Sequence, residues 1–396
     1  MKIAILISGG VDSSVALTLL KQARHDVTAF YLKIWLEDEL AYLGDCPWEE
    51  DLKYAQAVCD QLQVPLNVIP LQKEYWDRVV AYTIAEVKAG HTPSPDIMCN
   101  HHVKFGAFFD KIDASFDKVA TGHYAQTDMH EGKTRLLKAV DPIKDQTYFL
   151  ARLTQQQLSR ALFPIGHLTK AEVRALAEKY NLAPQHRKDS QGICFLGKIK
   201  FDEFIGHHLG KQPGKLIEFE SGQTVGTHDG FWFYTIGQRK GIGLSGGPWY
   251  VVAKEPATNT VFISKQYFSE EKERNQFSVN AINWIAGVPP AKAQAFAPIR
   301  LLSLKARFAQ GERIGILATV RGEQSVAKSN PYERLNLSIK LRHGEHYYTG
   351  TLTLTNSTSG NVTINGNDQG IAPGQFAVFY DGNVCLGCGT IQNDAL

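Results

Sequence analysis

The chain lacks any long run of apolar residues. No stretch approaches the roughly 20 residues that a membrane-spanning helix requires, so the sequence excludes a helical membrane protein. The first apolar segment, residues 2–7, follows Met1 directly and leads into a glycine-rich loop. This arrangement is typical of a buried strand and not of a secretory signal. We therefore expect a cytoplasmic protein without a membrane partner.

Cysteine and net charge are also scarce. Six cysteines in 396 residues do not form a small-domain disulfide framework, which indicates a reducing compartment. The 42 Lys and Arg residues nearly balance the 40 Asp and Glu residues, leaving a formal charge of +2. Any surface for nucleic acid must therefore be a local basic patch. The hydrophobic fraction of 43% is sufficient for the cores of two or three domains.

Apolar strands and amphipathic helices alternate through the first 200 residues. Strands are predicted at 2–7, 26–34 and 64–71 and from residue 118, and helices at 15–23, at 51–62 and within 153–182. This alternation favours an α/β fold in which helices cover both faces of a parallel sheet.

The character of the sequence changes near residue 201. Residues 213–265 contain short runs of Val, Ile, Phe, Trp and Tyr separated by glycine turns, which indicates a small β-rich unit. From about residue 277, short alternating segments such as 350–354 and 361–364 are typical of an antiparallel barrel or sandwich. We therefore predict three domains, at 1–200, 201–275 and 276–396.

A glycine-rich loop, SGGVDSS at residues 8–14, joins the first predicted strand to the first helix. Its two glycines let the backbone approach a ligand closely, and N–H groups at a helix start attract anions. The loop has no lysine where a Walker A loop requires one, so it is not the usual cradle for a γ-phosphate. Asp12 could cap the helix or help to hold Mg²⁺ carried by ATP.

Two cysteines lie in motifs that suggest chemistry. Cys99 follows a rigid loop with two prolines, just before an expected amphipathic helix, and two histidines and a lysine follow it closely. Such surroundings are reasons for a lowered thiol pKa. Asp96, three residues earlier, could act as an acid or base or could orient a substrate. Cys194 lies in KDSQGICF at 188–195, after a basic run at 186–188. Taken alone, each cysteine is equally compatible with a buried structural thiol.

The other cysteines have simpler interpretations. Cys59 is expected in the core because it lies in the middle of a helix. Cys385 and Cys388 form a single CxxC pair. A zinc site would need further ligands and a redox site would need a thioredoxin-like setting, so this pair is interpreted as structural.

The ordered motifs together resemble a known family. SGGVDSS resembles the nucleotide loop of the PP-loop ATP pyrophosphatase superfamily, and nearly the whole chain resembles the tRNA-specific 2-thiouridylases. The matching motifs are SGGVDSS at 8–14, PDIMCN with VKF at 95–105, ATGHYA at 120–125, KDQTYFL at 144–150, FPIG at 163–166, KDSQGICF at 188–195, TIGQRKGIG at 235–243 and PGQFAVFYDGNVCLG at 373–387.

The resemblance implies a fold and a set of partners. The implied fold is a Rossmann-like PP-loop domain, a small central β-rich domain, and a C-terminal antiparallel β-barrel that contacts tRNA. ATP with Mg²⁺ is implied, without a permanently bound metal or prosthetic group. The implied partners are the anticodon stem-loop of tRNA and a persulfide donor, which is either a sulfur-carrier protein or a cysteine desulfurase.

The resemblance also implies roles for individual residues. Cys99 corresponds to the nucleophile and Cys194 to the cysteine that carries the persulfide, and the two form a transient disulfide. The implied ATP contacts are Leu6, Ile7, Ser8, Gly9, Gly10, Val11, Asp12, Ser13, Leu32 and Gly122. The implied contacts to the target base are Ser94, Pro95 and Asp96, and those to tRNA are His123, Lys144, Asp145, Gln146, Arg307, Phe308 and Gln375.

The implied activity is ATP-dependent 2-thiolation of the wobble uridine in tRNA. The uracil C2 oxygen is adenylated, and sulfur from a cysteine persulfide then replaces it. Two other functions remain open on the residues alone. Another PP-loop adenylating enzyme, such as a tRNA lysidine synthase or an amidotransferase-type synthetase, would need no cysteine pair. A non-catalytic RNA-binding protein would keep the fold without splitting ATP.

Overall fold

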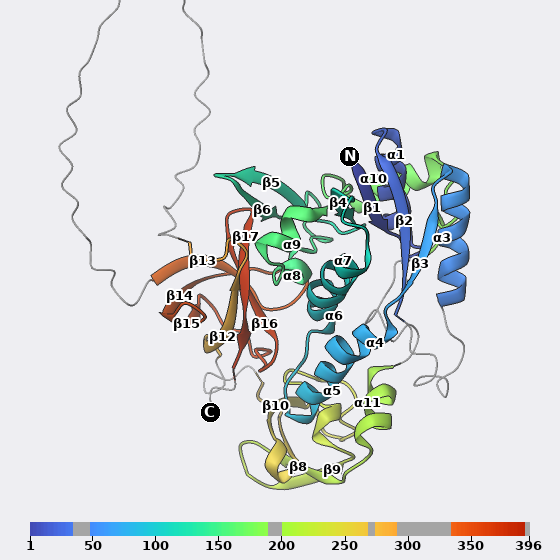
Figure 1. The fold of residues 1–396 in the computed structure, drawn as a ribbon. Helices are drawn as coiled ribbons and strands as arrows, with labels where there is room; N and C mark the ends of the chain where they lie inside the picture. The colour runs from blue at the N-terminus through green and yellow to red at the C-terminus, as the bar shows by residue number, and fades with distance from the viewer. Residues whose placement is uncertain (35–47, 189–199, 268–273, 291–333, 393–396) are drawn as a thin grey trace, which may run out of the picture.

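The computed structural model describes residues 1–34, 48–188, 200–267, 274–290 and 334–392. Three β-sheets organise them. Figure 1 shows a parallel sheet from the N-terminal part, a small sheet from the middle of the chain and a barrel from the C-terminal part. The helices α6 (Pro95–Cys99) and α7 (Phe108–Lys111) lie between the parallel sheet and the barrel, whereas α5 (Ala81–Lys88) lies nearer the small middle sheet.

The parallel sheet confirms the predicted α/β fold. Its order is β3-β2-β1-β4-β7, with strands β1 Lys2–Leu6, β2 Asp26–Lys33, β3 Leu66–Pro70, β4 Lys118–Ala120 and β7 Ala161–Leu162. Successive side chains of the central strand β1 enter two different cores, Ile3 and Ile5 on one face and Ala4 and Leu6 on the other. Because strand side chains alternate between faces, both faces need helices to bury them.

Two groups of helices supply this cover. The helices α1 (Val11–Gln22), α3 (Trp48–Leu62) and α10 (Lys170–Lys179) share a core with Ile3 and Ile5. The segment from α5 to α7 shares the other core with Ala4 and Leu6. Both α1 and α3 begin a few residues before the predicted starts. The first turn of α3 holds three acidic residues, which are favourable at a helix N-terminus.

The short strand β7 was not predicted. It follows α9 (Gln155–Arg160) and pairs with the end of β4 at the edge of the parallel sheet. The prediction of helices within 153–182 did not include this strand. A two-residue strand contains no alternation by which a sequence pattern could reveal it.

The middle and C-terminal sheets confirm the other two parts of the predicted fold class. β8 (Gly214–Glu218), β9 (Thr224–His228), β10 (Tyr250–Glu255) and β11 (Thr260–Ser264) form a sheet in the order β10-β11-β8-β9. The barrel strands are β12 Gln276–Trp284, β13 Arg334–Lys340, β14 Tyr348–Asn356, β15 Ser359–Ile364, β16 Phe376–Asp381 and β17 Val384–Ile391. The barrel closes because β12 pairs with both β15 and β17.

A hairpin from the N-terminal part extends the barrel sheet. β5 (Gln126–His130) and β6 (Lys133–Leu137) pair with each other, and β6 also pairs with β17 through Leu137↔Val384 and Leu136↔Cys385. Backbone hydrogen bonds across this seam therefore fix the barrel against the part of the chain that carries the glycine-rich loop. In Figure 1 the hairpin stands beside β17.

A buried ion pair reinforces the same seam. Lys340 Nζ lies 3.5 Å from Asp145 Oδ2, and the two side chains are 0% and 2% exposed. The Asp145 carboxylate also accepts hydrogen bonds from Tyr347 Oη (3.0 Å) and Thr147 Oγ1 (2.8 Å). The hydrogen bonds that these hydroxyls donate stabilise the negative charge of the carboxylate, which is buried away from water.

No helix among the described residues combines the length and the apolar character needed to cross a membrane.

Replacement of Lys340 by methionine is expected to destabilise the protein. The change leaves the Asp145 carboxylate buried without its countercharge, which costs about 3 kcal/mol in comparable buried pairs. The double variant Asp145→Asn with Lys340→Met should recover part of this loss, because neither member then carries a buried charge. Urea denaturation of the three proteins measures the differences.

The matched control is Lys73→Met, at an ion pair with Asp77 whose side chains are 84% and 51% exposed. Because exposed pairs contribute little, this variant should unfold like the wild type. Equal denaturation midpoints for Lys340→Met and Lys73→Met would contradict the importance of the buried pair.

Candidate active site

The glycine-rich loop connects the end of β1 to the start of α1. Gly9 has a left-handed backbone with φ of +71°, and a Cβ there would lie 2.2 Å from the carbonyl oxygen of Asp51. Ser13 Oγ donates to the Gly10 carbonyl oxygen (3.2 Å) and accepts from the Ser8 N–H (3.2 Å). The loop is therefore a fixed turn that has room only for glycine at position 9.

The start of α1 is open to an anion. Its N-cap residue is Gly10, which has no side chain to cap the helix. The first N–H groups of a helix lack carbonyl partners within the helix and carry partial positive charge. An uncapped helix start at the end of a central strand therefore suits a pyrophosphate group.

A second loop, the one that follows β4, lies against the same helix start. A Cβ at Gly122 would lie 2.7 Å from Ser13 N and 2.9 Å from the carbonyl carbon of Asp12. The strand order places β2 and β3 on one side of β1 and β4 and β7 on the other. Ligands of such sheets bind where the strand order reverses. The structure thus places the predicted ATP residues of β1, its loop and Gly122 at one edge, with Leu32 near the end of the adjacent β2.

Asp12 does not cap α1, because the cap position is Gly10. Its carboxylate instead pairs with Lys170 of α10, whose Nζ lies 2.7 and 2.9 Å from the two oxygens. Tyr124 Oη also donates to Asp12 Oδ1 at 2.9 Å. A mostly buried cation from a distant helix therefore stands beside the first turn of α1.

Arg187 brings a second cation to the loop. Its Nη1 donates to the Gly9 carbonyl oxygen (2.9 Å), and its Nη2 pairs with Asp51 Oδ1 (2.7 Å). The guanidinium also lies over the ring of Tyr54, 4.5 Å from its centroid. Arg187, the central residue of the basic run at 186–188, thus contacts the glycine-rich loop. It precedes the segment that contains Cys194.

Sequence reasoning missed Lys170 and Arg187 as members of this site. Lys170 follows Thr169, which forms a capping box with Glu172 at the start of α10. The local sequence around Lys170 therefore indicates a helix start and not a residue of a binding site. Both cations come from segments far along the chain from residues 8–14. Their approach to the loop is a property of the tertiary fold.

Cys99 lies within a helical segment and not before one. α6 ends at Cys99, and a π-helical segment, Asn100–Ala107, continues into α7. Ser94 is the N-cap residue of α6 and Pro95 its first residue. The predicted base-contact residues 94–96 therefore form the first turn of the helix that ends on the cysteine.

Burial, and not the nearby positive charge, governs the Cys99 thiol. The side chain is 1% exposed, and burial raises its pKa to about 11, while Lys104 lowers it and Asp96 raises it. The expectation of a lowered pKa is wrong for this conformation. Burial also lowers the pKa of His101 to about 4 and lowers that of His102. The two histidines are therefore neutral at pH 7 and supply no positive charge to the thiol.

Three buried acceptors near this segment have no hydrogen-bond partner among the described residues. Two are on the helix, Asp96 Oδ1 and Asn100 Oδ1, and the third is Gln375 Oε1 from the barrel. The loop before β16 that carries Gln375 reaches the approach to α6, since the Thr92 N–H donates to the Pro373 carbonyl oxygen at 2.7 Å. Buried acceptors without donors are uncommon in folded proteins. A bound ligand that carries N–H or O–H groups would supply donors to these acceptors.

The predicted tRNA-contact residues are held by the protein's own groups in this structure. His123 is 9% exposed and contacts Thr121 Oγ1 (2.8 Å), and burial lowers its pKa well below the usual value. Asp145 forms the buried pair with Lys340 described above. Gln146 Oε1 accepts from the Tyr124 N–H at 2.9 Å, and Lys144 is half-buried. Their contacts to tRNA stay predictions.

Several predicted site residues lie outside the described residues. They are Cys194, Arg307 and Phe308. The proposed meeting of Cys99 with Cys194 therefore stays a prediction.

The remaining described cysteines are buried thiols. Cys59 is in the core of α3, and Cys385 and Cys388 are free and buried on β17. In the described ranges, no group of three or more His, Cys, Asp or Glu side chains is arranged to hold a metal ion.

Comparison with protein families finds three matches along the chain. A family described as tRNA methyl transferase HUP domain matches residues 1–198. One described as tRNA methyl transferase PRC-barrel domain matches 202–265, and one described as aminomethyltransferase beta-barrel domain matches 319–391.

Curated relatives match over essentially the full length of the chain. A tRNA-specific 2-thiouridylase MnmA from Parabacteroides distasonis is 42% identical over 100% of this chain and 99% of its own. The proteins of that name from Porphyromonas gingivalis (40% identical) and, as MnmA 1, from Bacteroides thetaiotaomicron (41% identical) each match 99% of both chains.

A solved NMN synthetase from Francisella tularensis is 16% identical, with a TM-score of 0.31, over 53% of this chain and 78% of its own. That likeness is too low to support a conclusion. The full-length relatives are sufficient without it. On the strength of that full-length identity, added to the PP-loop geometry at the start of α1, the chain belongs to the tRNA-specific 2-thiouridylase family.

Proposed function

We propose that this chain is a tRNA-uridine 2-sulfurtransferase, which uses ATP to replace the C2 oxygen of the wobble uridine in tRNA with sulfur. One observation carries the proposal. Relatives that are named tRNA-specific 2-thiouridylases are about 40% identical over the full chain. The open helix start beside β1 and the cysteine-ended helix α6 are the two chemical elements that such a reaction requires.

ATP activates the oxygen that must leave. The pyrophosphate part of ATP binds the N–H groups at the start of α1, and Lys170 and Arg187 supply positive charge beside it. The uracil C2 oxygen attacks the α-phosphorus, pyrophosphate leaves, and the oxygen becomes part of an adenylate. Asp12 is the carboxylate at this loop that suits Mg²⁺ brought with ATP, because that ion prefers oxygen ligands.

The target uridine enters beside the first turn of α6. A base in a single-stranded anticodon loop is flipped out at little cost. We propose that Asp96 Oδ1, a buried acceptor that has no partner among the described residues, accepts the uracil N3–H. In this role Asp96 orients the ring and, as the C2 oxygen attacks, can take up the N3 proton.

Sulfur arrives as a persulfide on Cys194, delivered by a sulfur-carrier protein or a cysteine desulfurase. The terminal sulfur attacks C2, and AMP leaves with the former C2 oxygen. The Cys99 thiolate then attacks the Cys194 sulfur, which breaks the bond to the transferred sulfur and releases 2-thiouridine. The product of this step on the protein is a Cys99–Cys194 disulfide, which an external thiol reduces.

The thiol chemistry requires a change around Cys99. In the described conformation burial keeps this thiol protonated, so it is inactive until substrate binding alters its surroundings. Such protection is useful, because a buried thiol does not react with the persulfide before the uridine is adenylated.

Methyl transfer, which the family descriptions name, is disfavoured by the same site. Adding a methyl group does not require the removal of an oxygen. A methyl transfer would therefore not need a loop that binds and splits ATP. Replacement of oxygen by sulfur does require that the oxygen first become a good leaving group. The names of the full-length relatives agree with thiolation.

The two cysteines are expected to be essential for sulfur transfer but not for adenylation. Cys99→Ser and Cys194→Ser should each abolish 2-thiouridine formation while tRNA-dependent pyrophosphate release continues. Liquid chromatography with mass spectrometry of digested tRNA measures the first quantity, and a phosphate-coupled assay measures the second. Cys59→Ala, at a buried thiol in α3, is the control and should keep both activities. Full thiolation by either serine variant would exclude the scheme.

Lys170 is expected to act on the ATP half-reaction. Lys170→Met removes a charge beside the phosphates, so tRNA-dependent pyrophosphate release should slow by about 100-fold. The control is Lys179→Met, an exposed lysine at the end of the same helix, which should release pyrophosphate at the wild-type rate. Wild-type rates for both variants would remove Lys170 from the proposed site.

A further inference from the structure

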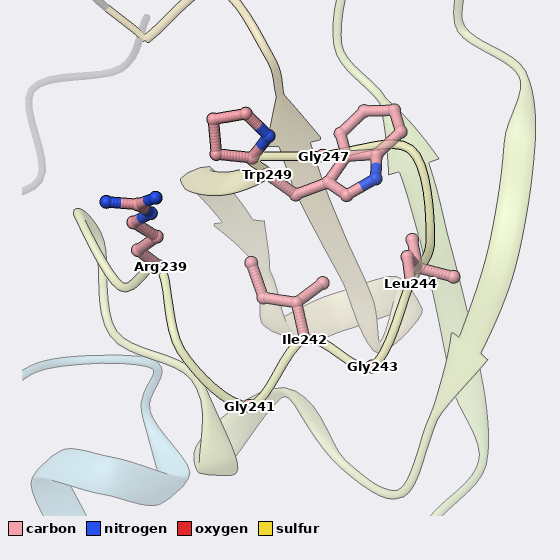
Figure 2. Close-up of a pocket in the computed structure, with 8 residues that line it drawn as sticks. Arg239, Gly241, Ile242, Gly243, Leu244, Gly247 and Trp249 are labelled. Atoms are coloured by element: carbon pink, nitrogen blue, oxygen red, sulfur yellow. The ribbon is translucent and has the colours of Figure 1, made fainter.

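The middle sheet carries a pocket of about 400 Å³ that the proposed function does not yet use. The pocket is an open hollow in the loop that leads into β10, and its lining residues are Arg239, Gly241, Ile242, Gly243, Leu244, Gly247, Pro248 and Trp249. Figure 2 shows Arg239 on one side, the Trp249 ring with Leu244 below it on the other, and Ile242 between the two sides. Ile242 and Trp249 are each 7% exposed, so they form a fixed apolar floor beneath an exposed charged rim.

The two limbs of this loop are held in place by hydrogen bonds. On one limb, Gln238 Oε1 accepts from the Thr235 N–H (2.9 Å) and Gln238 Nε2 donates to the Lys240 carbonyl oxygen (2.9 Å). On the other limb, Trp249 Nε1 donates to the Ser245 carbonyl oxygen (3.1 Å). The rim is thus ordered before any ligand binds, which lowers the entropic cost of binding.

The rim presents donors that the protein itself does not use. Among the described residues, none of the backbone N–H groups at 239–247 donates to a carbonyl or a side chain. Gly241, Gly243 and Gly246 have left-handed backbones, with φ of +81°, +74° and +72°. Successive N–H groups in turns that contain left-handed residues form concave sites for anions.

The charge of the loop has one sign. Residues 231–254 contain no Asp or Glu, and Arg239 and Lys240 are both exposed. In the part of the chain that the structure describes, no carboxylate pairs with either side chain. A third cation, Lys265, lies 4.5 Å from the centroid of the Trp249 ring. On a chain whose formal charge is only +2, such a patch is the local positive surface that RNA would need.

The chain that leads into this loop contacts the proposed catalytic segment. Thr235 lines a smaller pocket of about 150 Å³ together with Pro93 and Pro95, the two neighbours of Ser94. A Cβ at Gly237 would lie 3.5 Å from Gly370 Cα of the barrel. Arg239 follows Thr235 by four residues, which span at most about 14 Å, so a nucleic-acid strand whose base enters beside residues 94–96 can also reach this rim.

We infer that the pocket at 239–249 and its exposed rim bind a backbone phosphate of the tRNA through Arg239, Lys240 and the N–H groups of the loop that have no acceptor within the protein. The inference rests on the proposed function, since it assigns a further part of the same substrate to this surface. The phosphate takes charge-assisted bonds from the two cations, and the neighbouring ribose packs on the apolar floor. By anchoring the strand outside the catalytic segment, the loop fixes the position at which the uridine is extruded.

The test compares the binding of unmodified tRNA to the full-length chain over a range of salt concentrations. Arg239→Ala with Lys240→Ala should weaken binding roughly tenfold and reduce the slope of log K against log salt by about 2, because two phosphate-neutralising charges are lost. ATP binding and the unfolding temperature should not change. Lys215→Ala, an exposed lysine on β8 of the same sheet, is the matched control and should bind like the wild type.

Two outcomes would overturn the inference. The first is an unchanged tRNA affinity and salt slope in the Arg239 and Lys240 variant. The second is unchanged tRNA binding with a loss of turnover only when sulfur comes from a protein donor, which would make the pocket a docking site for that protein. A wild-type chain that does not thiolate tRNA would refute the proposed function itself. Normal wild-type thiolation with normal binding by the variant would refute only the phosphate site.

Discussion

The structure depends on close backbone packing around the first turn of α1. Gly9 lies against the backbone of α3, and Gly122 lies against the first turn of α1 itself, so neither position can hold a side chain. This packing brings the loops that follow β1 and β4 to one edge of the sheet. Lys170 and Arg187 then reach the same place from segments far along the chain. Nucleotide chemistry at this edge is therefore a consequence of how tightly the two loops approach one another.

A second constraint is the seam between the N-terminal part and the barrel. The β6–β17 pairing and the Asp145–Lys340 pair hold the barrel in one position relative to the nucleotide loop. From there a chain of contacts leads toward that loop, because Gln146 holds the Tyr124 backbone and Tyr124 Oη contacts Asp12. A substrate that touches the barrel and the loop together thus meets a preorganised surface and not two independent domains.

Much of this could be predicted from the sequence, and the exceptions have a common cause. The strand-loop-helix unit around SGGVDSS and the three-part fold were predictable because glycine spacing and apolar alternation are local signals. The raised pKa of Cys99 could not be predicted. Neighbouring charged residues are visible in the sequence, whereas burial depends on which distant residues pack around the thiol. For the same reason the burial of Asp145 could not be predicted, because its partner Lys340 lies almost 200 residues away along the chain. The β5–β6 hairpin extends the barrel sheet by a pairing that neither segment reveals alone.

The account is tested most directly by the fate of the uracil C2 oxygen. A tRNA transcript with oxygen-18 at C2 of its uridines is incubated with the protein, ATP and a persulfide source, and the small products are analysed by mass spectrometry. If the uridine is adenylated at the α1 loop, the heavy oxygen appears in AMP in an amount equal to the 2-thiouridine formed. Heavy oxygen found in water or pyrophosphate, or 2-thiouridine formed with unlabelled AMP, would contradict the account.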